Sequence, residues 1–315
     1  MPGQVWSVNQ AGGYAYSGEL TDVLRTAVQP QTRFVQHCDA DDFTDKGLHA
    51  GDAFQWTVYS DTKKQGGRLV ENRKMPETGF TITRGDGTVY EFGNSVPYSG
   101  VLDDLSYHPI KVIINKVMRN DAVKAFEKEA HAEFAKTPIK VGPATGTSTT
   151  AIAVSTNGIA PVTNNAPMTK EHLKKIVDLM KEDDTPAYAD GDYRCIGRPS
   201  TFRQLKDDLE PLHSYTAEGF RQIIAGEIGR SYEGVRMFEQ TAIASQGWVN
   251  GKSDQAFFFG EDTVIEAIVI PPEIRGKLPG DYGRDKGVAW YAIEGFALVH
   301  GNPEQARIYE WASQG

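Results

Sequence analysis

Apolar and polar residues alternate along the first clearly patterned part of the chain. Phe54, Trp56 and Val58 are separated by polar residues, and this period of two predicts a half-buried strand. Further on, Phe80–Arg84 and Thr88–Phe92 flank Gly85-Asp86-Gly87. Glycines on both sides of an aspartate allow the positive φ values of a tight turn. The sequence therefore predicts a hairpin there, and because an isolated hairpin is marginal in water, we expect it to lie on another subunit.

A helical period follows this β segment. Apolar residues recur at three- and four-residue steps between about Leu102 and Lys136, which predicts one long amphipathic helix. Pro109 is tolerated in or near its first turn, and Pro138 ends it. At 1.5 Å per residue, a helix of roughly 25–30 residues is about 40 Å long. The predicted inward positions are Ile110, Ile113, Ile114, Val117, Met118, Ala122, Phe126, Ala130 and Phe134.

A glycine-rich mixture of helices and strands occupies the part of the chain from about Ile159 to Ala292. Thr169 is expected to cap a helix whose apolar residues Leu173, Ile176, Val177 and Met180 face a core. Helices are also predicted after Pro199-Ser200, with Phe202, Leu205 and Leu209 inward, and at Ala217–Ala225. Strands are predicted at Tyr193–Ile196, Gly234–Glu239, Phe257–Phe259, Val264–Ile270, Val288–His300 and Ala306–Trp311, with a mobile loop at Gly276–Gly287.

The composition limits the classes of protein that fit. The 315 residues are enough for about two domains, and residues 1 to about 45 are polar and weakly patterned, as in an arm that orders against something else. We find no secretory signal at Met1–Gln10 and no transmembrane run. The net charge of −9 argues against a sequence-specific nucleic-acid binder. Cys38 and Cys195 are expected to be reduced thiols.

The polar clusters do not have the spacing of a known site. The acidic group Asp39, Asp41 and Asp45, near His37 and Cys38, lacks the glycine of a calcium loop. A second acidic group, Asp183 to Asp192, also lacks the calcium-loop pattern. The histidines are too dispersed for a zinc site, and there is no P-loop or G-x-S-x-G elbow. The sequence therefore predicts no catalytic, cofactor-binding or metal-binding residue. The remaining groups considered are Asp183, Asp184, Asp190 and Asp192; Asp281, Arg284, Asp285 and Lys286; and His37, His49, His108, His131, His172, His213 and His300.

The order of these features resembles the major capsid protein of tailed double-stranded-DNA phages, and more particularly its short-tailed-phage branch. The resemblance covers roughly residues 45 to 312. The motifs that carry it are Tyr193-Arg194-Cys195-Ile196-Gly197-Arg198-Pro199-Ser200 before a helix with Leu205 and Asp208, Gly226-Glu227-Ile228-Gly229-Arg230 before Gly234-Val235-Arg236, Phe259-Gly260-Glu261-Asp262, Asp281-Tyr282-Gly283-Arg284, and Trp290 before Phe296-Ala297-Leu298-Val299.

The resemblance implies an α+β capsid fold: an N-terminal arm at 1–45, an extended β loop at 46–99, a peripheral domain with the long spine helix at 100–158, an axial domain at 159–292, and C-terminal strands at 293–315 returning to the peripheral domain. It also implies a structural protein, not an enzyme, that assembles as hexamers and pentamers into an icosahedral shell around phage double-stranded DNA. Contacts between copies would use the loop and the arm. Expected partners are a scaffolding protein, a portal and a possible decoration protein, with the chain made in the host bacterial cytoplasm and incorporated in the virion.

Three alternatives remain open at this point. A bacterial nanocompartment shell protein shares the fold, a tail or decoration component is a different virion protein, and an enzyme on a β-rich α/β fold belongs to another class. A shell protein should form particles or hexamers, whereas an enzyme should form a small closed oligomer. The acidic balance favours a shell wall that holds DNA by confinement, with Lys111, Lys116, Arg119 and Lys124 as the residues to examine if DNA contacts the wall.

Overall fold

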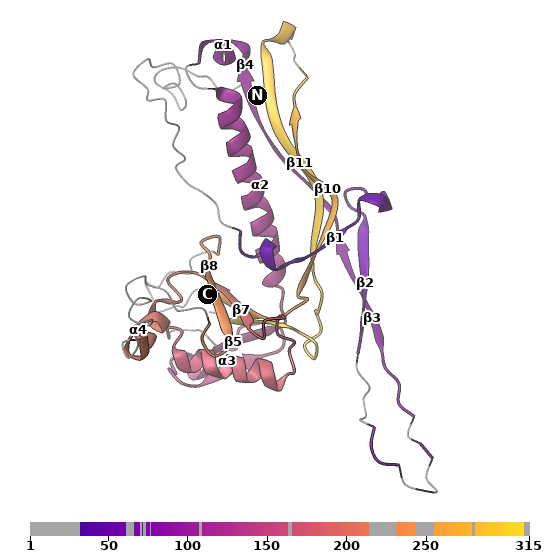
Figure 1. The fold of residues 1–315 in the computed structure, drawn as a ribbon, viewed down its shortest axis with the longest axis vertical. Helices are drawn as coiled ribbons and strands as arrows, with labels where there is room; N and C mark the ends of the chain where they lie inside the picture. Colours follow the sequence, from indigo (N-terminus) through magenta and orange to yellow (C-terminus); the bar gives the residue numbers. More distant parts are fainter. Residues whose placement is uncertain are drawn as a thin grey trace.

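The structure is a computed structural model that describes residues 32–60, 66–69, 71, 74–75, 77–106, 109–162, 166–213, 231–243, 255–278 and 281–311. The part of the predicted arm (1–45) before residue 32 and the predicted helix at Ala217–Ala225 lie outside these described residues. Figure 1 shows two main layers and a ribbon of strands that extends away from them.

The first layer is a four-stranded sheet with a long helix packed on one face. Its strand order is β1-β10-β11-β4, where β10 and β11 form a long antiparallel hairpin, β4 pairs antiparallel with β11, and β1 runs parallel to β10. The helix α2 covers the sheet face that carries Phe92, Trp290 and Phe296, whose rings all contact the ring of Phe126. The elements are β1 (Asp39–Asp42), β4 (Tyr90–Ser99), α1 (Gly100–Leu105), α2 (Ile110–Phe134), β10 (Val264–Gly276) and β11 (Asp285–Leu298).

Helix α2 differs from its prediction at its start and on one face. Pro109 is the residue before the helix, and the separate helix α1 ends at Leu105, because proline restricts the backbone before it. Every fourth residue from Ile110 to Phe134 is buried. Val117 lies off that ridge and is 51% exposed, so its predicted inward position was wrong.

The second layer is a six-stranded sheet with helices on it. Its order is β6-β5-β12-β9-β7-β8, and the predicted inward residues of α3 and α4 are buried. Thr169 caps α3 as expected, and the ring of His172 returns the capping contact to the Thr169 N–H. The elements are β5 (Ile139–Pro143), β6 (Ile152–Ser155), α3 (Lys170–Glu182), β7 (Tyr193–Gly197), α4 (Arg203–His213), β8 (Val235–Glu239), β9 (Ala256–Phe259) and β12 (Ile308–Trp311).

The two layers meet at strand β9. Phe257 and Phe259 belong to the hydrophobic core beneath α2, whereas Phe258 belongs to the core beneath α3. Successive side chains of a strand point to opposite faces, so three consecutive phenylalanines can each be fully buried only where both faces are covered. The sequence Phe257-Phe258-Phe259 therefore forms the joint between the two layers.

The predicted hairpin turn at Asp86 was wrong. Residues Ile82–Thr88 form one uninterrupted strand, β3, which pairs antiparallel with β2 (Ala53–Tyr59), while Tyr90 onward belongs to the four-stranded sheet. Gly85 and Gly87 serve a different purpose from a turn. A side chain at Gly85 would collide with the ring of Trp56, and one at Gly87 would lie 2.5 Å from the ring of Phe54. Glycine is required there by close approach.

The sheets also refine the expected domain limits. The expected boundary at residue 292 falls inside β11, which pairs with β10 beside α2. The terminal strand β12 pairs with β5 and β9 in the six-stranded sheet, because its buried residues, Trp311 among them, complete the core of that layer. The predicted loop at Gly276–Gly287 is shorter than expected, since β10 ends at Gly276 and β11 begins at Asp285.

Candidate assembly surfaces and polar clusters

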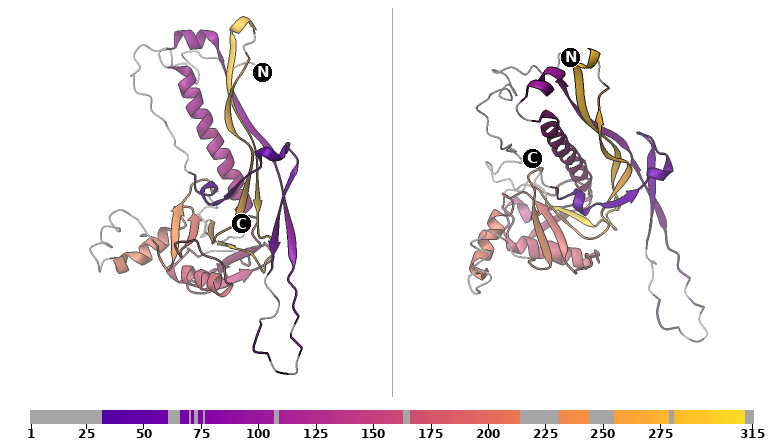
Figure 2. Two further views of the ribbon diagram at one scale, coloured as in Figure 1. Left: turned by 45° about the vertical axis from the view of Figure 1, so that its right-hand side comes forward. Right: turned by 45° about the horizontal axis from the view of Figure 1, so that its top comes forward.

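The ribbon formed by β2 and β3 is the first candidate assembly surface. Its root packs on the sheet, since Phe54 is buried and the indole N–H of Trp56 donates to the carbonyl oxygen of Val299 at 3.2 Å. Beyond the root it extends away from both layers (Figures 1 and 2). Large apolar side chains there face solvent, with Tyr59 79% exposed, and clustered exposure of this kind marks interaction sites. The exposed set is Tyr59, Leu69, Met75, Phe80 and Ile82.

A second apolar group lies at the end of the molecule formed by α1 and the β10–β11 hairpin, at the top of Figure 1. Leu278 is 89% exposed, Tyr282 is fully exposed, and Val101 on α1 is half-exposed. Lys286 fastens this end, because its ammonium group lies 2.9 Å from Asp103 of α1. The extended ribbon and this tip thus present apolar side chains at opposite ends of one subunit.

Of the charged residues near Gly276–Gly287, Asp281, Arg284 and Asp285 line one shallow hollow beside the start of α1, and all of them are held in ion pairs. Arg284 pairs with Asp281 at 3.7 Å, Asp285 pairs with Lys277, and Lys286 pairs with Asp103. Each pair joins neighbouring segments of the hairpin tip or joins the tip to α1. In this fold the ion pairs of the group connect the hairpin tip to itself and to α1.

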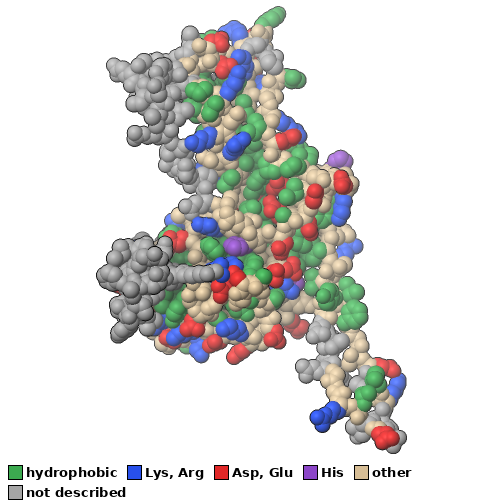
Figure 3. All heavy atoms as spheres, viewed as in Figure 1, with side chains coloured by type: hydrophobic (Ala, Val, Ile, Leu, Met, Phe, Trp, Pro, Cys, Tyr) green, Lys and Arg blue, Asp and Glu red, His purple; other side chains and the backbone are tan. Residues whose placement is uncertain are grey.

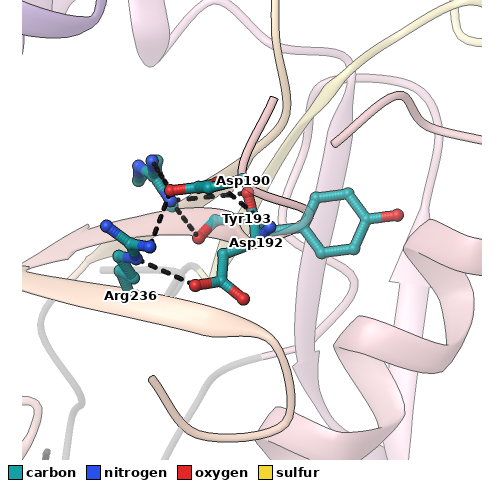
Figure 4. Close-up of polar contacts among 5 residues, drawn as sticks. Asp190, Asp192, Tyr193 and Arg236 are labelled. Atoms are coloured by element: carbon teal, nitrogen blue, oxygen red, sulfur yellow. Dashed lines mark hydrogen bonds and ion pairs between the residues drawn. The ribbon is translucent and has the colours of Figure 1, made fainter. Parts of the chain in front are cut away.

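The acidic group around Asp190 is held by arginines (Figure 4). Asp190 accepts from Arg194 and from Arg236, each at 2.7 Å, and Asp192 accepts from Arg236 at 2.8 Å. The hydrogen bond from Arg194 lowers the pKa of Asp190. Asp183 instead accepts from the hydroxyl of Tyr309 at 2.8 Å. These contacts tie β7 to β8, and among the described residues no group of side chains could hold a metal ion.

The group around Cys38 is also dispersed in the fold. The ring of His37 packs against Tyr188, Phe238 and Phe259, and burial lowers its pKa to about 4. Asp39 and Asp41 lie on β1, whereas Asp45 lies in the following turn. Both cysteines are free, and burial raises the pKa of each thiol well above its ordinary value.

The remaining histidines occupy separate places. His131 packs between Phe34 and Phe257, His172 caps α3, and burial lowers the pKa of both rings. His300 lies 3.2 Å from Asp262, and His49 lies in an exposed turn. His108 and the side chain of His213 lie outside what the structure describes. None of the histidines that are described comes together with others at metal-ligand spacing.

Two buried carboxyl groups under α2 were missed by the sequence analysis. Glu294 of β11 is 2% exposed, and Glu266 of β10 lies on the same sheet face, opposite Phe296. One oxygen of Glu294 has no hydrogen-bond partner among the described residues. Burial, and then the charge of Glu266, raises the pKa of Glu294 to about 8. No local sequence signal marks this pair, because alternation alone does not show that both faces of β11 are covered.

This pair predicts a pH-dependent stability. Unfolded Glu294 loses its proton near pH 4.5, whereas the folded group keeps it up to about pH 8. The contribution of Glu294 to the stability of the folded state is therefore fully present below pH 4.5 and is lost as the pH rises to about 8. We expect Glu294→Gln to raise stability at pH 7 by about 3 kcal/mol and to have little effect at pH 4.5. Thermal melting across this pH range measures it, with Glu273→Gln, an exposed ion-paired glutamate, as control. Parallel pH profiles for wild type and Glu294→Gln would contradict the assignment.

Glu127 of α2 holds the chain where the described residues begin. Its buried carboxylate accepts from the backbone N–H groups of Arg33 at 2.7 Å, Phe34 at 2.9 Å and Val35 at 3.3 Å. The carboxylate also accepts a hydrogen bond from the side-chain amide of Gln240 at 2.5 Å. Gln240 directly follows β8. Glu127 therefore joins the end of the arm, the long helix and the second layer. Its sequence neighbourhood gives no sign of these contacts, because all four donors lie about ninety or more positions away along the chain.

Known capsid proteins share this family and fold. The family model for "Phage capsid protein" matches residues 86–308. No curated protein matches the chain by sequence. Among solved structures, the capsid of cyanophage Pam1 has a TM-score of 0.67 at 15% identity, covering 98% of this chain and 99% of that one. The capsid of Ralstonia phage GP4 has a TM-score of 0.66 at 12% identity, covering 98% of each chain.

The capsid of cyanophage P-SCSP1u has a TM-score of 0.66 at 10% identity, covering 99% of this chain and 97% of that one. These likenesses confirm the predicted fold over nearly the whole chain, ribbon included. No helix among the described residues is long and apolar enough to cross a membrane. With the family model matching well over half of its length, the chain belongs to the phage capsid protein family.

Proposed function

We propose that this chain is the structural major capsid protein of a phage and that it assembles as hexamers and pentamers into an icosahedral shell around double-stranded DNA. The proposal rests on one observation: in this member of the phage capsid protein family, the ribbon presents apolar side chains far from the core of its own subunit. A single copy leaves that surface in water, which costs roughly 25 cal/mol per Å² of apolar area. A neighbouring copy that covers the ribbon removes this cost, so assembly is favoured.

The partners and location follow from the same proposal. Copies contact each other through the extended ribbon and the segment before residue 32. A scaffolding protein, a portal and a decoration protein are the further partners that such a shell uses. The chain is made in the host cytoplasm and ends in the virion. A nanocompartment shell and an enzyme are not favoured, because the family match is to phage capsid proteins.

Particle formation tests the proposed function. We expect the purified chain, with its scaffolding protein present, to form closed particles or hexamers visible by negative-stain microscopy. Trimming the segment at Asp61–Gly67 should weaken these particles and leave the isolated subunit folded, because the residues of this segment are polar or glycine. Melting of particles and of isolated subunits separates the two effects. Sedimentation that shows only monomer at high concentration would contradict the proposal.

A further inference from the structure

The solvent-facing side of α2 carries a row of mostly basic residues. The helix buries every fourth residue from Ile110 to Phe134, so the opposite ridge begins two residues later. From Lys116 onward that ridge contains four lysines, one asparagine and one alanine, and no acidic residue. Arg119 is exposed beside it. Figure 3 shows blue side chains spaced along this part of the molecule. The ridge residues are Lys116, Asn120, Lys124, Lys128, Ala132 and Lys136.

Three of the four acidic residues of the same helix are already engaged, the half-buried Glu129 being the fourth, and most of the exposed basic ones are not. Asp121 accepts from the indole N–H of Trp290 at 2.9 Å, Glu127 accepts from backbone N–H groups, and Glu133 pairs with Lys136. Within the part of the chain that the structure describes, no ion pair or hydrogen bond involves the side chains of four cations. These four, called the α2 cations below, are Lys116, Arg119, Lys124 and Lys128. Free cations grouped on one helix are notable in a chain of net charge −9.

The spacing of the α2 cations suits a rod-like polyanion. Twelve residues separate Lys116 from Lys128, which corresponds to about 18 Å along a helix axis. Double-stranded DNA presents a negative charge about every 1.7 Å along its axis, so several phosphates lie within that length. A protein partner would instead need apolar surface at the centre of its interface. Between Lys116 and Lys136 the ridge offers only Asn120 and Ala132 besides lysines, and the exposed Val112 and Val117 lie toward the start of the helix and not at the centre of the row.

We propose that α2 faces the enclosed DNA and that the α2 cations contact its phosphates without reading its sequence. This inference rests on the proposed capsid function. It replaces the expectation that the shell holds DNA by confinement alone with a local basic line on an acidic subunit. Phosphate contacts release counterions, so the contribution of these side chains falls steeply as salt rises.

Binding of a labelled 30-base-pair duplex to the full-length chain tests the proposal, at concentrations below those that give particles. Four phosphate contacts predict a slope of about −3.6 for the logarithm of affinity against the logarithm of salt concentration. This slope corresponds to a loss of roughly a hundredfold in affinity between 50 and 200 mM salt. Changing all four α2 cations to glutamine should remove most of the slope, and each single change should reduce it by about 1.

A matched control changes four lysines on another helix. Lys170, Lys174, Lys175 and Lys181 lie on α3, interspersed with Glu171 and Asp178, and their change to glutamine alters net charge equally. We expect this control to keep the wild-type slope. An equal loss in both quadruple variants would overturn the proposal by showing a general charge effect, and so would a wild-type slope in the α2 variant.

Particle formation by the unmodified chain, the α2 variant and the α3 control separates the proposed capsid function from the proposed DNA contact. If the unmodified chain forms no particles with its scaffolding protein, the capsid function itself fails. If particles form but the α2 variant binds DNA like wild type, only the DNA contact fails. An α2 variant that binds DNA normally but cannot assemble would overturn the proposal in favour of a protein partner. If polyglutamate displaces the wild-type chain from the scaffolding protein but does not displace it from the duplex, the result would support that same outcome.

Discussion

A valine at position 87 is expected to release the β2–β3 ribbon from the body of the subunit and to prevent particle formation. The ring of Phe54 lies in a slot between two glycines. A side chain at Gly87 would lie 2.5 Å from this ring and 2.7 Å from Ala297, and one at Gly295 would lie 2.8 Å from the ring. Phe54 cannot move aside without leaving its cluster with Ile265, so the root of the ribbon must detach or distort.

The size of the effect follows from overpacking and lost burial. Forcing extra atoms into a packed site costs about 1–3 kcal/mol, and exposing a phenylalanine costs about 2 kcal/mol. A change of about 1.4 kcal/mol alters an equilibrium constant tenfold. Because the contact made by the ribbon is repeated around the shell, a loss of this size in every copy should prevent assembly. The second layer, with the six-stranded sheet, does not touch the slot and should stay folded.

Particle yield and subunit folding measure this prediction separately. Negative-stain particle counts should fall by more than about tenfold for Gly87→Val, whereas the circular dichroism of the subunit should change little. Gly79→Val is the matched control, because a side chain at this ribbon position meets nothing within 4 Å. Wild-type particle yield from Gly87→Val would show that the slot is not needed for assembly.

The glycines of the ribbon show where reasoning from sequence reached its limit. The motif Gly85-Asp86-Gly87 fits a tight turn, but neither glycine has a positive φ in the structure. Both are required because the rings of Trp56 and Phe54, across the strand pair, occupy the space of their side chains. Local patterns cannot distinguish these two reasons for glycine, since the second depends on residues some thirty positions away.

Periodic segments with local signals were predicted well. The capping threonine and the apolar face of α3 were correct because both depend on residues within one helix. The long helix was predicted correctly along its buried ridge, but it begins at Ile110, after the separate helix α1, and Val117 is exposed. Pairings between distant strands, such as β1 with β10 and β12 with β5, had no local signal. The polar contacts of Glu127 were missed for the same reason.

Replacing Glu127 with alanine is expected to detach the arm and to destabilise the subunit. The carboxylate accepts from the N–H groups of Arg33, Phe34 and Val35, and alanine would leave these donors without an acceptor. A buried unsatisfied donor costs about 1–3 kcal/mol, so the total loss should be about 3 kcal/mol or more. Since roughly 1 kcal/mol shifts the melting temperature of a chain of 150–250 residues by 2–4 °C, we expect a decrease of several degrees.

Thermal melting and limited trypsin digestion together test the role of Glu127. Phe34 packs against Phe134 and Phe257, so loss of the carboxylate should loosen this packing and expose the bond after Arg33 to trypsin. Glu129→Ala, on the same helix two residues away, should keep both wild-type melting and wild-type cleavage. Glu127→Gln keeps an acceptor oxygen and should fall between wild type and alanine. If Glu127→Ala melts early but is cleaved no faster after Arg33, the carboxylate stabilises α2 without holding the arm, because only release of the arm exposes that bond.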